Sequence, residues 1–104
     1  MAELEWQQEG YLKSAVAELG GMTYKLSVPG VRGYPDRLVK LPNVSAFVVE
    51  LKRPKGGRLA ALQVVRHKEM RDVGWRVYVC KNREEIDDVV HTELRRVAGS
   101  DDAT

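Results

Sequence analysis

Apolar and polar residues alternate along the chain with two different periods, and each period predicts one kind of element. Apolar residues spaced by three or four positions, as at Leu12 and Val16, are typical of helices. The segments with this spacing are residues 3–19, 58–73 and 82 onward. Period-two alternation or a short apolar run is typical of strands instead. The segments of that kind are residues 22–28, 37–41, 46–52 and 75–80.

Glycine, proline and asparagine residues predict the turns between these segments. Gly20–Gly21 ends the first helix, residues 29–35 form a loop, and Pro42–Asn43 turns the second strand back toward the third. The order αβββαβα predicts an antiparallel meander and then a helical crossover, which places the fourth strand parallel to a neighbour. We therefore expect an α/β fold with a mixed sheet of about four strands flanked by helices.

Length and composition indicate a single globular domain. The chain has 104 residues, of which 43% are hydrophobic and 31% are charged. We expect the domain to span residues 1–98 and a small, acidic tail to span residues 99–104. No apolar run approaches the roughly 20 residues that cross a bilayer, so no membrane partner is expected. Cys80 is the single cysteine, which excludes an intrachain disulfide and a multi-cysteine zinc site and favours a reducing cytoplasm.

Charge is distributed unevenly along the chain. The net formal charge is +2, but residues 25–58 carry eight Lys and Arg residues against two Asp and Glu residues. A basic block of this kind suits a polyanionic ligand, although a solvated basic loop would have the same composition. The two acids of the block, Asp36 and Glu50, carry the candidate chemistry.

Glu50 and Lys52 lie at the end of an apolar run, where charged side chains are costly unless a metal ion or a partner compensates them. Because strand side chains alternate, both project from one face of the strand and Leu51 from the other. A hairpin at Pro42–Asn43 would bring Asp36 beside them. Two carboxylates, the Leu51 backbone carbonyl, waters and a substrate phosphate can complete the octahedral shell of Mg²⁺. Lys52 could then orient or deprotonate the attacking water.

The same residues could also be purely structural. Glu50 and Lys52 could pair on a solvated strand face, and Asp36 after Pro35 could be an ordinary turn residue. A lone Glu-x-Lys pattern favours that interpretation. The combination of Pro35–Asp36, the fourteen-residue spacing to Glu50 and the apolar strand favours a metal site that cleaves phosphodiesters.

Several motifs together resemble the virus-type replication–repair nuclease domain, VRR-NUC, a branch of the PD-(D/E)xK nucleases. They are Gly30–Asp36, Val49–Pro54 and Gly56–Leu59, followed by Gln63. The resemblance runs from about Glu9 to Val90 and is to the stand-alone phage and bacterial members. It implies a restriction-endonuclease-like fold and the cytoplasm of a bacterial or phage-infected host cell.

The resemblance implies a role for each matched position. Asp36 and Glu50 would bind Mg²⁺ or Mn²⁺, and Lys52 would be the catalytic lysine. Gln63 would support the metal-bound water or a ligand. From the residues alone, Gln63 could instead be a glutamine at the edge of the core with its hydrogen bonds satisfied.

Family members also carry an acid on the first helix. Glu9 is the better match for it here, and Glu5, one turn earlier, is the competitor. Neither histidine is expected to bind metal: His67 faces the same way as Gln63 and is expected to be packed or at the edge of the substrate, and His91 to be an ordinary residue of the last helix.

Basic residues that flank the site could contact DNA phosphates and fix register without reading sequence. They are Arg32, Arg53, Lys55 and Arg58. The sequence contains no base-reading helix, zinc finger or row of stacking aromatics, so recognition of DNA shape is expected. The resemblance implies a homodimeric, Mg²⁺-dependent endonuclease that resolves four-way (Holliday) junctions. A nuclease for flaps or other branched DNA, and a non-catalytic DNA-binding module on a nuclease fold, are the alternatives.

Overall fold

The computed structural model describes residues 4–99, which form three helices around a four-stranded sheet. In chain order the elements are α1 (Glu5–Glu18), β1 (Met22–Lys25), β2 (Arg37–Lys40), β3 (Phe47–Leu51), α2 (Ala61–Asp72), β4 (Val77–Cys80) and α3 (Arg83–Gly99). The expected order of elements is therefore confirmed. None of the helices in this part of the chain combines the length and the apolar character needed to cross a membrane.

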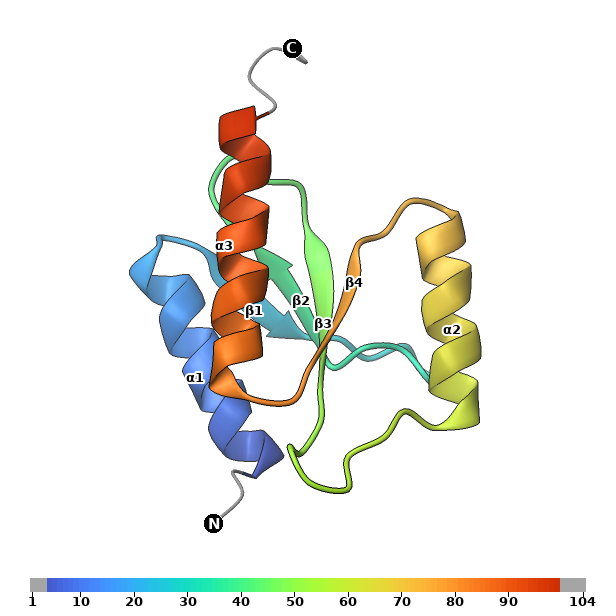
Figure 1. The fold of residues 1–104 in the computed structure, drawn as a ribbon. Helices are drawn as coiled ribbons and strands as arrows, with labels where there is room; N and C mark the ends of the chain where they lie inside the picture. The colour runs from blue at the N-terminus through green and yellow to red at the C-terminus, as the bar shows by residue number, and fades with distance from the viewer. Residues whose placement is uncertain (1–3, 100–104) are drawn as a thin grey trace.

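The strands lie side by side in chain order, β1-β2-β3-β4 (Figure 1). β1 and β3 both run antiparallel to β2, whereas β3 and β4 are parallel. β3 and β4 can be parallel because α2, between them in the chain, carries the chain back to the end of the sheet where β3 begins. This is the mixed α/β sheet that the sequence predicts.

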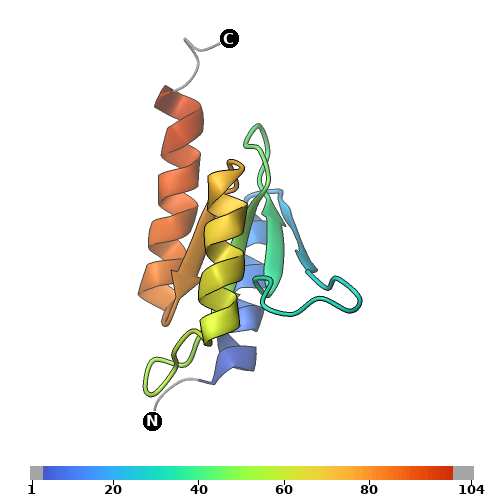
Figure 2. The same cartoon turned by 90° about the vertical axis from the view of Figure 1, so that its right-hand side faces the viewer.

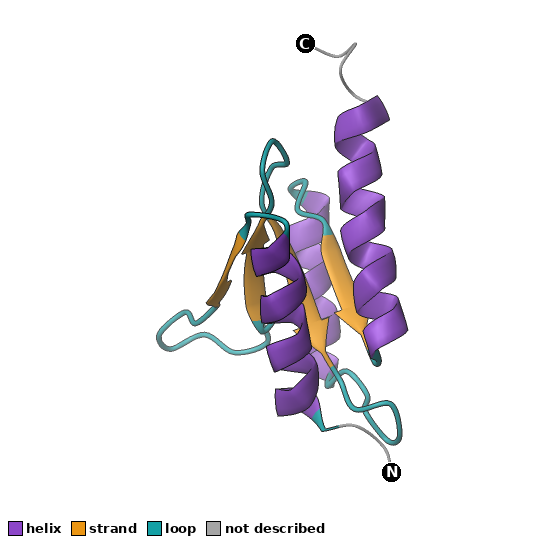
Figure 3. Ribbon diagram, turned by 90° about the vertical axis from the view of Figure 1, so that its left-hand side faces the viewer, coloured by secondary structure: helices purple, strands orange, loops and turns teal. Residues whose placement is uncertain are grey.

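The helices form two layers, with α1 and α3 on one face of the sheet and α2 on the other (Figure 2, Figure 3). Alternate residues of β3 pack against the two helical layers, because successive strand side chains point to opposite faces of the sheet. Val49 and Leu51 pack with α1 and α3, whereas Val48 packs with Met70 of α2. Glu50 lies on the same face as Val48 and therefore points toward α2.

Several expected boundaries were wrong by two or three residues. β1 ends at Lys25 instead of residue 28, and β4 begins at Val77 instead of residue 75. Trp75 is not in the strand because its N–H donates to the Met70 carbonyl and closes the end of α2. α3 continues through Gly99, and residues 1–3 and 100–104, which include the rest of the expected tail, lie outside the described residues.

The inward stripe of α1 also differs from the expected one. Its buried side chains are Gln8, Leu12 and Val16, whereas Leu19 is 41% exposed. α1 ends at Glu18, and the turn that follows carries Leu19 away from the sheet. A polar side chain, Gln8, thus occupies the position one turn before Leu12 that faces the end of β3.

A buried polar cluster lies at the N-terminal ends of β3 and β4. Arg76 donates hydrogen bonds of 2.7 and 2.8 Å to the two carboxylate oxygens of Glu93 on α3, and another of 2.7 Å to the Ser45 carbonyl. The Tyr78 hydroxyl also donates to Glu93, whose side chain is fully buried. This cluster connects α3 to the sheet at the end of the strands opposite to Glu50 and Lys52.

Candidate active site

The pairing of β2 with β3 brings the two candidate carboxylates together. Arg37 of β2 lies opposite Val49 of β3, so Asp36, one residue before Arg37, lies opposite Glu50. Cross-strand neighbours project from the same face, so both side chains point to the same side of the sheet. Asp36 Oδ2 accepts a hydrogen bond of 2.9 Å from the N–H of Leu51, which holds Asp36 at this end of β3.

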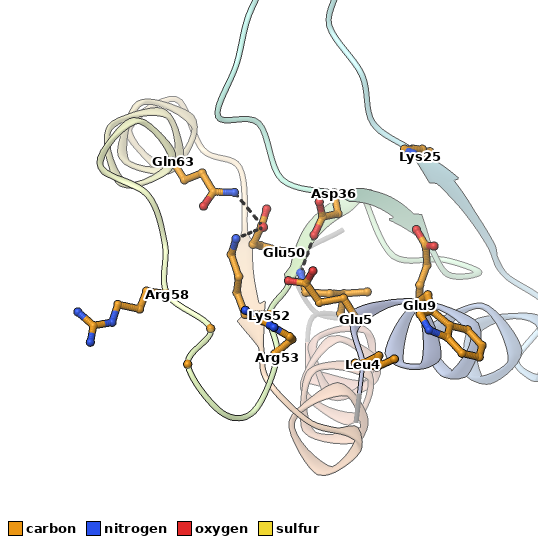
Figure 4. Close-up of a pocket in the computed structure, with 14 residues that line it drawn as sticks. Leu4, Glu5, Glu9, Lys25, Asp36, Glu50, Lys52, Arg53, Arg58 and Gln63 are labelled. Atoms are coloured by element: carbon orange, nitrogen blue, oxygen red, sulfur yellow. Dashed lines mark hydrogen bonds and ion pairs between the residues drawn. The ribbon is translucent and has the colours of Figure 1, made fainter. Parts of the chain in front are cut away.

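Glu50 is almost completely buried, with 1% of its surface exposed. Its Oε2 receives a hydrogen bond of 2.9 Å from Gln63 Nε2 and lies 3.2 Å from Lys52 Nζ (Figure 4). Its Oε1 is also buried and has no hydrogen-bond partner among the described residues. Glu50 and Lys52 do pair, but not on a solvated strand face, because only 2% of the Glu50 side chain and 17% of the Lys52 side chain are exposed.

The buried position of Glu50 and its neighbour Asp36 disfavour the charged form of the Glu50 carboxylate. Burial raises the pKa of Glu50, the nearby Asp36 raises it further, and the Lys52 ammonium only partly offsets them, so that this pKa reaches about 7. A divalent cation between Asp36 and Glu50 would reverse this balance, because it favours ionised carboxylates. The unpartnered Glu50 Oε1 would be available as a ligand for such a cation. The oxygen donors present thus fit a hard cation such as Mg²⁺.

Gln63 connects this carboxylate to the start of α2. Its Oε1 accepts a hydrogen bond of 2.9 Å from the N–H of Ala60, the residue that caps the helix, while its Nε2 donates to Glu50. Because the helix cap occupies the carbonyl oxygen, the amide can only present its N–H groups to Glu50. The two hydrogen bonds therefore fix the orientation of the Gln63 amide.

Glu9 lies apart from the Asp36–Glu50 pair. Its Oε2 is 3.2 Å from a guanidinium nitrogen of Arg37, a buried arginine that also donates to the Thr23 carbonyl. Both Glu9 and Glu5 line the same cleft, but Figure 4 shows Glu9 beside β1, whereas Glu5 lies between Asp36 and Lys52 in that view. Within residues 4–99 no three His, Cys, Asp or Glu side chains form a group that could hold a metal ion.

Two buried residues near the site were missed or undervalued by the sequence reasoning. Gln8 of α1 is fully buried and donates a hydrogen bond of 3.0 Å to the backbone carbonyl of Lys52, which fixes the segment that carries the lysine. His67 of α2 is also fully buried, and its Nε2 lies 3.9 Å from Glu50 Oε1. Burial lowers the pKa of His67, and the positive charges of Arg71 and Lys52 lower it further. The spacing of four residues from Gln63 to His67 was the available signal.

The candidate residues surround a cleft of about 710 Å³. Two of the four expected phosphate-binding residues, Arg53 and Arg58, line the cleft, and so does Lys25, which the sequence did not single out. Arg32 and Lys55 are exposed but are not among its lining residues. Leu51 also lies on the cleft wall, where its N–H is bonded to Asp36.

Gly33 explains how the loop before Asp36 can lie against α2. Its φ is +93°, and a Cβ atom at this position would lie 2.9 Å from the Leu62 carbonyl oxygen. A side chain is therefore excluded both by conformation and by space. The Arg66 guanidinium strengthens the same contact by donating to the Arg32 carbonyl at 3.2 Å.

Comparisons with known proteins bear on these features. No protein-family model matches the chain. "Putative nuclease p44" of Acyrthosiphon pisum secondary endosymbiont phage 1 is 40% identical over 76 residues, which cover 73% of this chain and 81% of that protein. A solved structure named as a VRR-NUC domain is 31% identical, with a TM-score of 0.78, over 84% of this chain and 94% of that one. The chain is thus similar to both over most of its length.

Proposed function

The chain belongs to the VRR-NUC family, and from the geometry of its cleft we propose that it is a Mg²⁺-dependent endonuclease for branched DNA. The observation that carries the proposal is the buried Glu50, which faces Asp36 across two strands and has one carboxylate oxygen without a partner. Asp36, Glu50 and the Leu51 carbonyl would hold Mg²⁺ or Mn²⁺. The ion would supply an activated water and polarise the scissile phosphodiester.

Lys52 would act on the charge that develops at the phosphate. Its ammonium lies 3.2 Å from Glu50 Oε2 on the lining of the cleft, where it could orient the attacking water or neutralise the phosphorane oxygens. Gln8 donates to the Lys52 carbonyl and would thereby fix the backbone that carries this side chain. Gln63 keeps the Glu50 carboxylate in place from the other side.

DNA would be held mainly through its phosphates. Arg53 and Arg58 line the cleft beside Lys52, and the exposed Arg32 and Lys55 would extend the basic surface beyond it. Glu9, or Glu5 in its place, would be the first-helix acid that the family carries. Glu9 would then have to leave or share its contact with Arg37.

The preference for four-way junctions and the homodimer are supported by the resemblance to stand-alone phage and bacterial members. A two-fold dimer would present two identical clefts to two strands related by the same symmetry. Paired, symmetric cuts are the expected result. A flap or general branched-DNA nuclease would use the same cleft with a different arrangement of subunits.

A cleavage panel tests this function. Four-way junction, flap, fork and linear duplex DNAs of equal arm length, with hairpin-closed duplex arms and internal fluorophores, are incubated with Mg²⁺, Mn²⁺ or EDTA. Closed duplex arms leave an exonuclease no duplex end to start from, and internal fluorophores locate each cut. We expect symmetric cuts near the centre of the junction, slower cleavage of the other DNAs and none in EDTA.

The panel also distinguishes the alternatives. Faster cleavage of flaps would replace the junction assignment by the flap assignment. Binding of branched DNA without cleavage in either metal would favour the non-catalytic DNA-binding module. Light scattering of the same samples, with and without the junction, measures whether the active species is a dimer.

Gln63→Glu is expected to lower kcat by about 10- to 100-fold. A glutamate can still accept the hydrogen bond of the Ala60 N–H, so α2 keeps its cap, but it has no donor for Glu50 and adds a negative charge. Single-turnover cleavage and thermal unfolding are measured together. Wild-type rates would contradict the assignment and indicate that position 63 acts through an oxygen atom.

A further inference from the structure

His67 is a buried side chain for which the packing of the protein provides no hydrogen bond. Its ring is fully buried on the inner face of α2, and neither Nδ1 nor Nε2 has a hydrogen-bond partner among the described residues. Buried polar groups are normally bonded, so an unbonded one requires an explanation. A packing role alone does not supply it, because an apolar residue would fill the same space without the unmet nitrogens.

The position of the ring relative to Glu50 supplies a reason. Gln63 and His67 are one turn apart on α2, and each directs a nitrogen toward a different oxygen of the same carboxylate. Gln63 Nε2 lies 2.9 Å from Glu50 Oε2, and His67 Nε2 lies 3.9 Å from Glu50 Oε1. The second distance exceeds a hydrogen bond, but contacts between catalytic groups are often long before substrate binds and tighten in the complex.

We propose that His67 is a positioning residue for Glu50, donating its Nε2–H to Oε1 and thereby fixing the plane of the carboxylate that would hold the metal ion. The proposal rests on the proposed function, since it presupposes that Glu50 is a metal ligand. Lys52 and Gln63 both approach Oε2, so without His67 nothing described holds Oε1. Carboxylate oxygens have two acceptor positions each, so Oε1 can accept from His67 and still bind a cation.

The first test measures Mn²⁺ affinity by calorimetry on four proteins: wild type, His67→Leu, His67→Gln and His67→Asn. Leucine keeps the apolar volume but has no donor. Glutamine places its amide N–H near the position of Nε2, where it can donate to Glu50. Asparagine places its amide near Nδ1, and its side chain is too short to reach Glu50. We expect His67→Leu and His67→Asn to bind Mn²⁺ about 10-fold or more weakly, and His67→Gln to recover most of the affinity.

Stability measured without metal separates positioning from packing. Because His67→Leu removes two unpaired buried nitrogens, its unfolding midpoint in EDTA is expected to equal or exceed that of wild type. A positioning role thus predicts weaker metal binding without lower stability. Equal Mn²⁺ affinity in wild type and His67→Leu would overturn the proposal. Equal affinity in His67→Gln and His67→Asn, with both weakened, would overturn it too.

A second measurement uses the wild-type protein and does not depend on any variant folding. Nitrogen NMR of ¹⁵N-histidine-labelled protein saturated with Mg²⁺ reports which ring nitrogen carries the proton, with the exposed His91 as internal reference. We expect Nε2 of His67 to be protonated and Nδ1 to be bare. A bare Nε2 would overturn the proposal. If wild type binds neither metal, whereas folding is intact, the proposed function itself fails together with this inference.

Discussion

Lys52→Met is expected to lower the kcat of DNA cleavage by about 10²- to 10³-fold, while the protein remains folded. Methionine keeps the apolar stem of the side chain but removes the ammonium that lies 3.2 Å from Glu50 Oε2 on the lining of the cleft. The developing charge at the phosphate would then be unopposed by this group. Single-turnover cleavage of the preferred DNA at saturating protein measures the effect.

Lys68→Met is the matched control for this variant. Lys68 is an exposed lysine on the outer face of α2, and its ion pair with Asp72 is a surface contact of small energetic value. We expect wild-type cleavage rates from it. A contaminating nuclease would leave the Lys52 and Lys68 variants equally active, and that result would remove the support for catalysis by this cleft.

The cleavage rate of Lys52→Met should depend on pH more steeply than the wild-type rate, so the ratio of the wild-type rate to the variant rate is expected to fall as the pH rises. The ammonium is one of the groups that lower the pKa of Glu50 against the effects of burial and of Asp36. Without it, the pKa of Glu50 rises further above about 7, so the variant needs a higher pH to ionise its metal ligand. Mn²⁺ affinity of the variant is expected to recover as the pH is raised.

Arg76→Met is expected to lower the free energy of unfolding by about 3 to 5 kcal/mol without altering the cleft. Glu93 is fully buried and receives hydrogen bonds from the Arg76 guanidinium and the Tyr78 hydroxyl. Methionine leaves this carboxylate with the Tyr78 hydroxyl and a distant, largely exposed Arg96 at 3.9 Å. Urea unfolding at pH 7 measures the difference.

The difference in unfolding free energy between wild type and Arg76→Met is expected to depend on pH. Burial alone would raise the pKa of Glu93, but the hydrogen bonds from Arg76 and Tyr78 outweigh burial and lower it. An acid with a lowered pKa stabilises the fold above its ordinary pKa, and this contribution is lost as the pH falls through the lowered value. The gap between wild type and Arg76→Met should therefore narrow below about pH 4.

A double variant tests the reason for the loss. Arg76→Met combined with Glu93→Leu removes both charges together, so no unpaired carboxylate remains buried. We expect it to recover much of the stability that the single variant loses. A double variant no more stable than Arg76→Met would show that the unpaired carboxylate is not the cause, and that the loss of the Arg76 guanidinium from the Phe47 ring, which both variants share, dominates.

Much of the arrangement of the cleft follows from periodicity and turn residues. The alternation of β3 places Glu50 on the opposite face from Leu51, and the turn at Pro42–Asn43, where Asn43 has a φ of 63°, folds β2 back against it. These two local features bring Asp36 opposite Glu50, as the sequence predicted. Their roles in catalysis, together with those of Lys52 and Gln63, stay predictions.

Contacts that form only when helices pack on the sheet could not be predicted from local patterns. Gln8 and Glu9 are adjacent polar residues on one helix, and only the docking of α1 decides that Gln8 donates to the Lys52 carbonyl and that Glu9 pairs with Arg37. The helical pattern pointed to Leu19 as inward facing, yet α1 ends one residue too early for it to reach the core. His67 was expected to be packed, but its nearness to Glu50 was not foreseen.

The sequence by itself determined the order of elements, the face of β3 that carries Glu50 and the spacing that lets two carboxylates meet, because strand alternation and turn conformation act over a few residues. Tertiary structure alone decided how deeply Glu50 is buried, which helix residues reach it and how far its pKa rises. Burial and electrostatic coupling depend on atoms that are distant along the chain, so no local pattern encodes them.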